Sequence, residues 1–187
     1  MVKSELRKKY KELRNSLTDN YIEEQSLAIA NRLLSLPIWE KSYYHIFLSI
    51  SSKKEINTSY ILHILQGKDK NIIISKSNFQ DLSLQHFLLT DTTVIRPNHW
   101  GIPEPEEGIE VPIQKIDVVF IPLLTFDVSG NRVGYGKGFY DGFLAQCKPE
   151  TLKIGLSFFE PEDQIDDISK SDIPLDFCIT PKNTYTF

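Results

Sequence analysis

The chain has 187 residues, of which 41% are hydrophobic and 25% charged, and its formal net charge is −4. This length and balance are typical of one globular domain, which we expect to span residues 1–187. The negative charge argues against a nucleic-acid binder, and no apolar run approaches the ~20 residues of a membrane span. The charged N-terminus lacks the apolar core of a signal peptide. We therefore expect a cytoplasmic monomer that acts on small molecules, with Cys147 and Cys178 as free thiols.

The first segment, residues 3–17, has the periodicity of an amphipathic helix. Its apolar residues recur three and four positions apart, as a buried stripe requires: Leu6, Tyr10, Leu13 and Leu17. The other faces carry six basic residues, among them Lys3 and Arg7. A basic run of this kind is usually a solvated face, and the residues alone favour that interpretation.

A second helix and a buried strand follow. Thr18 is an expected N-cap, and residues 22–33 supply an apolar stripe. Residues 43–50 are apolar nearly throughout, which predicts a strand buried on both faces. Residues 49–55 then form a polar loop at the carboxyl end of that strand. A third helix is expected over residues 58–67.

The middle of the chain predicts a sheet edge and a long loop. Residues 71–76 and 82–89 read as strands, and their short connection favours antiparallel pairing. Residues 97–112 hold four prolines and two glycines, so they form a loop of a length that is usually functional. Trp100 in this loop is either a core plug beneath it or the wall of a pocket.

The most informative stretch follows a strongly apolar strand at residues 116–124. Three alternating glycines allow positive φ angles and let a ligand approach the backbone: Gly134, Gly136 and Gly138. The N–H groups of this loop and of the following helix start suit a phosphate, and Arg132 and Lys137 add positive charge. Asp141, one turn into the helix, can hold a divalent cation beside that phosphate. A plain connecting turn is the alternative, but it would not require these charged neighbours.

The last third completes an alternation of strands and helices. Residues 152–158 predict a strand parallel to the one at 116–124. The acidic residues of the 160–174 run, such as Asp163, Asp166 and Asp167, are expected to be solvated, and residues 176–180 to form the last strand. The alternation predicts an α/β fold with a mainly parallel sheet, whose sites lie at the carboxyl ends of strands.

The segment from Phe126 to Asp141 resembles the signature of the 5-formyltetrahydrofolate cyclo-ligase family, FD-x-x-G-x-R-x-G-x-G-x-G-[YF]-Y-D. It matches at every glycine, at Arg132 and Tyr140, and at both aspartates, Asp127 and Asp141. The resemblance covers most of the chain and implies a three-layer α/β/α fold. The family more often has Tyr where this chain has Phe139, so no chemistry is assigned to that ring.

The resemblance implies a site for ATP and Mg²⁺. The implied ATP-binding residues are Lys3, Arg7, Arg132, Gly134, Gly136, Lys137, Gly138 and Tyr140. Among them Lys137 and Arg132 would neutralise charge during the reaction. Asp141 and Asp172 are the implied metal ligands, although the Gln and His that the family has near this second aspartate are not cleanly matched here.

The resemblance also implies a folate pocket. Glu55, with Ile50 beside it, would accept hydrogen bonds from the pterin in a charge-assisted, bidentate contact. A lone glutamate in a first helical turn is more often favoured only by the helix dipole, so this role depends on the resemblance. Trp100 and Tyr140 would complete the pocket.

The implied reaction is the ATP-dependent conversion of 5-formyltetrahydrofolate to 5,10-methenyltetrahydrofolate, with release of ADP and phosphate. Two other classes remain open from the residues. A nucleotide-binding regulatory module would bind ATP without folate turnover. A sugar-phosphate isomerase or CoA transferase can occupy a similar fold but needs no ATP.

Overall fold

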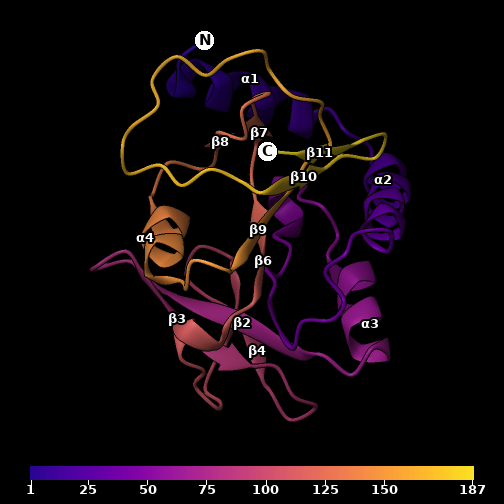
Figure 1. Ribbon diagram of the computed structural model, residues 1–187, viewed down its shortest axis with the longest axis vertical. Helices are drawn as coiled ribbons and strands as arrows, with labels where there is room; N and C mark the ends of the chain where they lie inside the picture. Colours follow the sequence, from indigo (N-terminus) through magenta and orange to yellow (C-terminus); the bar gives the residue numbers. More distant parts are fainter.

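The computed structural model describes residues 1–187 as a seven-stranded sheet with helices on both faces (Figure 1). The strands of this sheet are β1 (Tyr43–His45), β2 (Asn71–Asn78), β3 (Ser83–Leu88), β6 (Val118–Pro122), β9 (Leu152–Leu156), β10 (Phe177–Ile179) and β11 (Thr184–Thr186). Their order is β11-β10-β9-β6-β1-β2-β3, and only the two outer pairs, β10–β11 and β2–β3, are antiparallel. The mainly parallel sheet and its antiparallel edge at β2–β3 are therefore confirmed.

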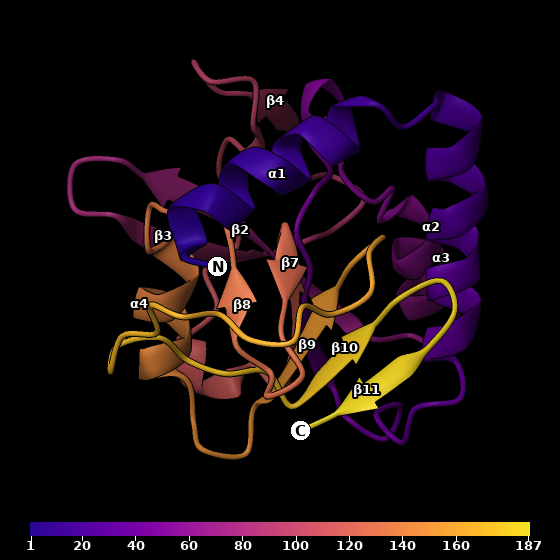
Figure 2. The same ribbon diagram turned by 90° about the horizontal axis from the view of Figure 1, so that it is seen from above.

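The helices make the three layers that the family resemblance implied. They are α1 (Lys3–Asn15), α2 (Asp19–Leu33), α3 (Ser59–Gly67) and α4 (Phe139–Gln146), with 3₁₀ turns η1 (Ser51–Lys53) and η2 (Ile113–Lys115). Helices α2 and α3 cover one face of the sheet and α4 covers the other, while α1 crosses one end (Figures 1 and 2). No helix of the protein combines the length and the apolar character that crossing a bilayer requires.

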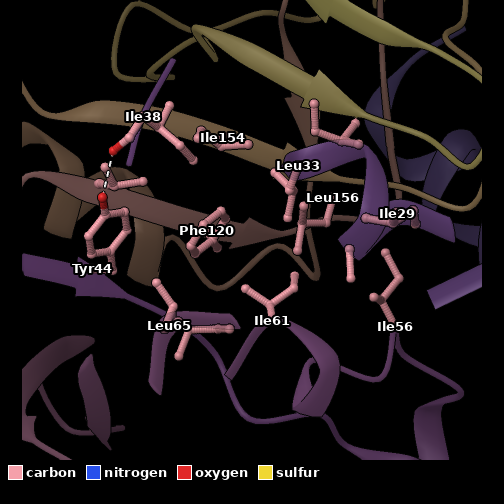
Figure 3. Close-up of a cluster of buried hydrophobic side chains, with 14 of the residues drawn as sticks. Ile29, Leu33, Ile38, Tyr44, Ile56, Ile61, Leu65, Phe120, Ile154 and Leu156 are labelled. Carbon is pink, nitrogen blue, oxygen red and sulfur yellow. Dashed lines mark hydrogen bonds between the residues drawn. The ribbon is translucent and has the colours of Figure 1, made fainter. Parts of the chain in front are cut away.

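The central strand β6 joins two hydrophobic cores. Side chains alternate between the faces of a strand, so Val118 and Phe120 enter the core beneath α2 and α3 (Figure 3), whereas Val119 and Ile121 enter the core beneath α4. All four are fully buried. Burial on both faces explains why the sequence of this strand is a continuous apolar run.

Helix α1 buries a different stripe from the expected one. Leu6 and Tyr10 are buried as predicted, but Leu13 is 40% exposed and Arg14 is only 6% exposed. The guanidinium of Arg14 donates to the Tyr135 hydroxyl and to the Leu123 carbonyl, both at 2.7 Å. These bonds offset the desolvation of the charge and turn this side of α1 inward.

Two strand predictions need correction. The strand expected over residues 43–50 ends at His45, because after the bond from the Ile46 N–H to the Ile73 carbonyl (2.9 Å) the chain turns toward the start of α3. There the Phe47 carbonyl accepts from the Thr58 hydroxyl at 2.8 Å. Residues 176–180 hold β10, but it is not the last strand, since β11 folds back on it.

Two small antiparallel pairs lie outside the large sheet. β4 (Ile95–Pro97) pairs with β5 (Pro103–Pro105) inside the proline-rich loop. β7 (Thr125–Phe126) pairs with β8 (Arg132–Val133), so a hairpin separates β6 from the glycine loop. The sequence analysis did not predict this hairpin.

Candidate active site

A cleft of about 470 Å³ opens at the carboxyl end of the central strands. Helix α1, the segment after β1, strand β2 and the glycine loop before α4 form its walls. All thirteen predicted site residues line it: Lys3, Arg7, Ile50, Glu55, Trp100, Arg132, Gly134, Gly136, Lys137, Gly138, Tyr140, Asp141 and Asp172. The structure thus brings together residues from both ends and the middle of the chain.

The glycine loop requires its glycines. Gly136 and Gly138 have φ angles of 94° and 79°, a region that other residues rarely adopt. A Cβ on Gly136 would lie 3.1 Å from the guanidinium carbon of Arg7. The Nε of the same arginine donates to the Gly134 carbonyl at 3.0 Å. Helix α1 therefore packs directly on the loop, as expected.

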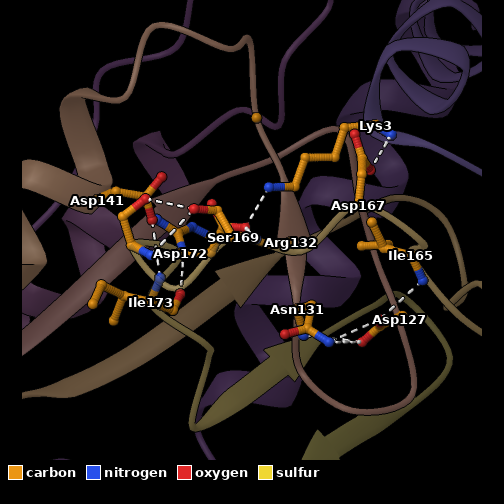
Figure 4. A network of polar contacts seen from close by, with 12 residues as sticks. Lys3, Asp127, Asn131, Arg132, Asp141, Ile165, Asp167, Ser169, Asp172 and Ile173 are labelled. Atoms are coloured by element: carbon orange, nitrogen blue, oxygen red, sulfur yellow. Dashed lines mark hydrogen bonds and ion pairs between the residues drawn. The ribbon is translucent and has the colours of Figure 1, made fainter.

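Asp127, the first aspartate of the motif, has a structural role. Its Oδ1 accepts from the N–H groups of Ser129 and Asn131, both at 3.0 Å, and its Oδ2 accepts from the Ile165 N–H at 3.1 Å. Figure 4 shows the contacts to Asn131 and Ile165. This buried carboxylate closes the β7–β8 hairpin and fixes the segment after β9 to it, which positions the loop that follows.

Arg132 and Asp141 form an ion pair at the base of the loop, with Nη2 and Oδ1 2.8 Å apart (Figure 4). The Ile173 N–H donates to the same Oδ1 at 3.0 Å, and Arg132 donates to the Ile173 carbonyl. The side chain of Arg132 is only 7% exposed. Asp141 lines the cleft, and its second oxygen has no protein partner.

A second ion pair joins Lys3 to Asp172 across the cleft mouth (Figure 4). Burial opposes ionisation of Asp172, but the hydrogen bonds from Lys3 and from the Ser169 N–H outweigh it and hold the pKa of this carboxyl below its usual value. Its Oδ1, like the Oδ2 of Asp141, has no protein partner.

The acidic run before Asp172 contacts the N-terminal residues. Asp166 forms an ion pair with the N-terminal ammonium of Met1 at 2.8 Å, and Asp167 accepts from the Lys3 N–H at 2.7 Å. Both carboxylates satisfy donors at the N-terminus of α1, as the helix dipole favours. Asp166 and Asp167 remain exposed despite these contacts, so the prediction of a solvated surface holds for them and for Asp163, which is exposed and unpaired.

The charge of the cleft is opposite in sign to that of the protein. Six basic side chains line it: Lys3, Arg7, Lys11, Lys53, Arg132 and Lys137. Three acidic side chains line it: Glu55, Asp141 and Asp172. The chain as a whole carries −4. Lys137 is exposed and has no protein partner, so its charge is available to a ligand.

A series of hydrogen bonds between buried polar side chains connects the glycine loop to Glu55. The Tyr135 hydroxyl accepts from Arg14 and donates to the Glu55 Oε1, with both distances 2.7 Å, and the Ile50 N–H donates to the Glu55 Oε2 at 2.8 Å. Burial, and then the charge of Glu55, raise the pKa of Tyr135 well above its usual value. The ammonium of Lys53 lies 4.4 Å from the centre of the same ring. Sequence reasoning missed Tyr135 and Arg14.

Aromatic side chains form the opposite wall. Trp100 is 56% exposed and stacks on Phe79, with ring centres 4.0 Å apart, and Phe79 meets Phe139 edge-on at 5.1 Å. Trp100 is therefore a pocket wall and not a core plug. Burial, and then the charge of Glu55, raise the pKa of Tyr140 above its usual value, so this phenol is neutral.

Three further polar residues were not predicted, and two of them, His45 and Ser75, line the cleft. His45, Ser75 and His86 lie on β1, β2 and β3 and are joined by hydrogen bonds. Their signal in the sequence is weak, because β2 and β3 carry several other polar residues. No group of three or more His, Cys, Asp or Glu side chains forms a ready metal site, so a metal here would also need oxygens from a ligand.

The fold and this basic, glycine-rich cleft define an α/β protein built to bind an anionic ligand at the carboxyl end of its sheet. Comparison with known proteins identifies the family. A profile of the 5-formyltetrahydrofolate cyclo-ligase family matches residues 1–181, and the chain belongs to this family. This confirms the resemblance found at the glycine loop.

Individual relatives agree along most of their length. The probable 5-formyltetrahydrofolate cyclo-ligase of Schizosaccharomyces pombe is 25% identical over 181 residues, which cover 89% of this chain and 88% of the relative. The 5-formyltetrahydrofolate cyclo-ligase of Haemophilus influenzae is 27% identical over 163 residues, covering 83% and 85%. The solved structure of Aquifex aeolicus 5,10-methenyltetrahydrofolate synthetase has a TM-score of 0.84 and 29% identity, covering 100% of this chain and 93% of that one.

Proposed function

We propose that the protein is an ATP-dependent ligase that converts 5-formyltetrahydrofolate to 5,10-methenyltetrahydrofolate, ADP and phosphate. The observation that carries the proposal is the single cleft in which the glycine loop of the family signature faces Glu55 and the aromatic wall. Membership of the cyclo-ligase family supports it. The cleft volume of about 470 Å³ lies within the range of ligand sites.

ATP would bind along the side of the cleft formed by α1 and the glycine loop. The loop amides at Gly134, Gly136 and Gly138, with the N-terminus of α4, suit the phosphates. Lys3 and Arg7 would add charge from α1, and Tyr140 would contact the nucleotide and the folate where the two sites meet. Lys137, which has no protein partner, is the residue best placed to follow the phosphoryl group during transfer.

The folate would bind against Glu55. Each oxygen of this carboxylate already accepts one protein hydrogen bond, so one further lone pair on each is available to pterin N–H donors. Burial of Glu55 strengthens such contacts. Trp100 would stack on the ligand from the opposite wall, and Ile50 would line the pocket beside Glu55.

The chemistry needs positioning more than covalent help from the protein. The formyl oxygen is a poor leaving group until it takes the γ-phosphoryl group of ATP. N10 of the folate then attacks the activated carbon, and phosphate departs. The cleft would hold the oxygen in line with phosphorus, and Lys137 and Arg132 would offset the charge that develops on the transferred group.

The residues present fit Mg²⁺ bound together with the nucleotide. Asp141 and Asp172 each keep one oxygen without a protein partner, and Mg²⁺ needs only one or two carboxylates beside phosphate oxygens and water. When bound, the metal would neutralise phosphate charge. The pairs Arg132–Asp141 and Lys3–Asp172 place one cation beside each carboxylate. Each pair can therefore offer its cation to phosphate and its carboxylate to the metal.

We also infer one domain over residues 1–187 and a cytoplasmic monomer. The large sheet contains strands from residue 43 to residue 186, and β6 joins the cores on its two faces, which supports a single domain. Cys147 and Cys178 are unpaired thiols, in keeping with a reducing compartment. Size-exclusion chromatography with light scattering tests the monomer, since a mass of twice 21.6 kDa would contradict it.

The decisive experiment follows absorbance of the methenyl product. Purified protein with 5-formyltetrahydrofolate, ATP and magnesium should form this product and release ADP. Product formation at the same rate without ATP would refute the proposal. ATP binding with no folate turnover would instead identify a regulatory module, and sugar-phosphate isomerisation without ATP would identify the third class.

A further inference from the structure

Three polar side chains on neighbouring strands are joined by hydrogen bonds, and two of them, His45 and Ser75, line the cleft. His45 on β1 and His86 on β3 are 1% and 3% exposed, and Ser75 on β2 lies between them and lines the cleft. The Ser75 Oγ is 2.6 Å from the His45 Nε2 and 2.7 Å from the His86 Nδ1. Both rings pack on Phe143 of α4, at centre distances of 4.9 and 4.3 Å. The serine hydroxyl is therefore held by two buried imidazoles.

Burial sets the charge of both rings. It lowers the pKa of His86 to about 4, and burial together with the nearby His86 lowers the pKa of His45 well below its ordinary value. Both imidazoles are neutral at pH 7, and each carries one proton on one of its two nitrogens. Which nitrogen carries it decides what the Ser75 hydroxyl can do.

The two outer nitrogens determine the proton positions. The His45 Nδ1 and the His86 Nε2 are buried and have no hydrogen-bond partner. A proton on either of them would be a buried N–H without an acceptor, which is unfavourable. With both protons on the inner nitrogens, the His45 Nε2 and the His86 Nδ1 each donate to Ser75, and only lone pairs are left unpaired.

This arrangement leaves the Ser75 hydroxyl as a directed donor. Its Oγ accepts two hydrogen bonds, so its own proton occupies the remaining tetrahedral position, away from both rings. No other protein group accepts from it. Since Ser75 lines the cleft, this proton is available to a bound ligand that carries an acceptor.

We propose that Ser75 is a specificity-determining residue that donates a hydrogen bond to a carbonyl oxygen of the folate substrate. The inference rests on the proposed function. The folate is favoured over ATP because Ser75 lies on β2, and the residue that follows this strand, Phe79, stacks on Trp100 of the aromatic wall. The cations assigned to the phosphates come instead from α1 and the glycine loop. Two carbonyls have the required chemistry, one on the pterin ring and one in the 5-formyl group.

The proton positions are tested first, on the wild-type protein without substrate. Nitrogen-15 NMR of the imidazoles should show the Nε2–H tautomer for His45 and the Nδ1–H tautomer for His86 at pH 7. The Nε2–H tautomer at His86, or the Nδ1–H tautomer at His45, would mean that Ser75 donates to an imidazole, and would overturn the proposal. This measurement does not depend on the proposed function.

Binding is tested by titrating folates into variants and following tryptophan fluorescence. Ser75→Ala should raise the Kd of 5-formyltetrahydrofolate by about 3- to 10-fold, the loss expected for one neutral hydrogen bond, with little change in the KM for ATP. Ser75→Thr keeps the hydroxyl and should restore affinity. Ser129→Ala, at an exposed serine that does not line the cleft, is the control and should change the Kd by less than about twofold.

A second ligand separates the two carbonyls. 5-Methyltetrahydrofolate has the pterin carbonyl but no formyl oxygen. Equal weakening of both ligands by Ser75→Ala would identify the pterin carbonyl, and weakening of the formyl compound alone would identify the formyl oxygen. Unchanged affinity for both ligands would overturn the proposal. If the wild type bound neither folate, the proposed function would fail, while the NMR result would still stand by itself.

Discussion

Tyr135 joins the glycine loop to Glu55, and its hydroxyl is the atom whose removal should have the clearest effect. In Tyr135→Phe the ring remains, but Arg14 and Glu55 each lose a hydrogen bond of 2.7 Å. Both of these charged residues are only 6% exposed, so water does not readily replace the lost partner. Arg14 already has one buried nitrogen, its Nε, without a partner.

The size of the effect follows from these two bonds. A hydrogen bond to a charged group contributes about 1.5–3 kcal/mol. Arg14 and Glu55 attract each other once the hydroxyl is gone, so we expect about 2–4 kcal/mol less than wild type in the free energy of unfolding, below the simple sum. For a chain of this length that lowers the Tm by roughly 5–15 °C. Since Glu55 also loses its orientation, the KM for the folate should rise by about 10-fold, and more than the KM for ATP.

Urea unfolding and steady-state kinetics measure both effects. Tyr21→Phe is the matched control, because the Tyr21 hydroxyl has no hydrogen-bond partner and its ring lies at the surface, 37% exposed. This control should stay within about 0.5 kcal/mol of wild type. If Tyr135→Phe unfolded at the same urea concentration as wild type and kept the same KM for the folate, the hydrogen bonds of Tyr135 to Arg14 and Glu55 would have no energetic role. The reasoning would then be refuted.

Three further predictions address charge. Lys137→Ala should lower ATP-dependent turnover by about 30- to 1000-fold, which corresponds to a loss of roughly 2–4 kcal/mol of transition-state stabilisation. Its Tm should not change, because Lys137 has no protein partner. An unaltered rate would show that Lys137 is only a surface residue. Asp172→Asn should raise the magnesium concentration needed for half-maximal rate. Asp163→Asn, at an exposed and unpaired residue, is the control and should not raise it. If wild type and Asp172→Asn depended on magnesium in the same way, Asp172 would not be a metal ligand. Burial lowers the pKa of His86 to about 4, so between pH 6.5 and 4 the unfolded chain takes up a proton that the native chain does not. Stability should therefore fall by about 3 kcal/mol over this range from His86 alone, and unfolding of His86→Phe should show a correspondingly flatter pH dependence.

Much of the fold was predictable because local pattern and tertiary burial agree. Strand β6 is apolar on both faces since both cores meet there, and Thr18 caps α2 as its position suggests, accepting from the Tyr21 N–H. The errors arise where contacts between residues far apart in the sequence determine the ends or the existence of a strand. β1 ends at His45 although the apolar run continues, because the chain must turn there to form the cleft wall and bring Glu55 to it. Strand β11 is polar and mostly exposed at a sheet edge, so its sequence carries no hydrophobic signal.

The site was predictable to the extent that the order and direction of the strands bring its residues together. Loops that follow parallel strands meet at the carboxyl end of the sheet, and the predicted residues line the cleft there. The side-chain networks were not predictable, because they join residues far apart in the sequence: Arg14 and Tyr135 are separated by 121 positions, and Tyr135 and Glu55 by 80. In the motif Tyr135 stands only as a spacer between two glycines. Its role depends on what lies across the cleft.

Helix α1 shows how one stripe of residues can complete such a site. Lys3, Arg7 and Arg14 are spaced by four and seven positions and share one face of the helix. Lys3 pairs with Asp172, Arg7 donates to the Gly134 carbonyl, and Arg14 donates to Tyr135. Two of the contacts are with the glycine loop and the third is with the segment before β10, so α1 fixes these two parts of the site relative to one another. A basic helical face that would usually be solvated is here turned inward because each cation meets an acceptor in the loops it covers. Lys3 and Arg7 also line the cleft and contribute to its positive charge, and in the proposed reaction they serve both the architecture of the site and the phosphates of its ligand.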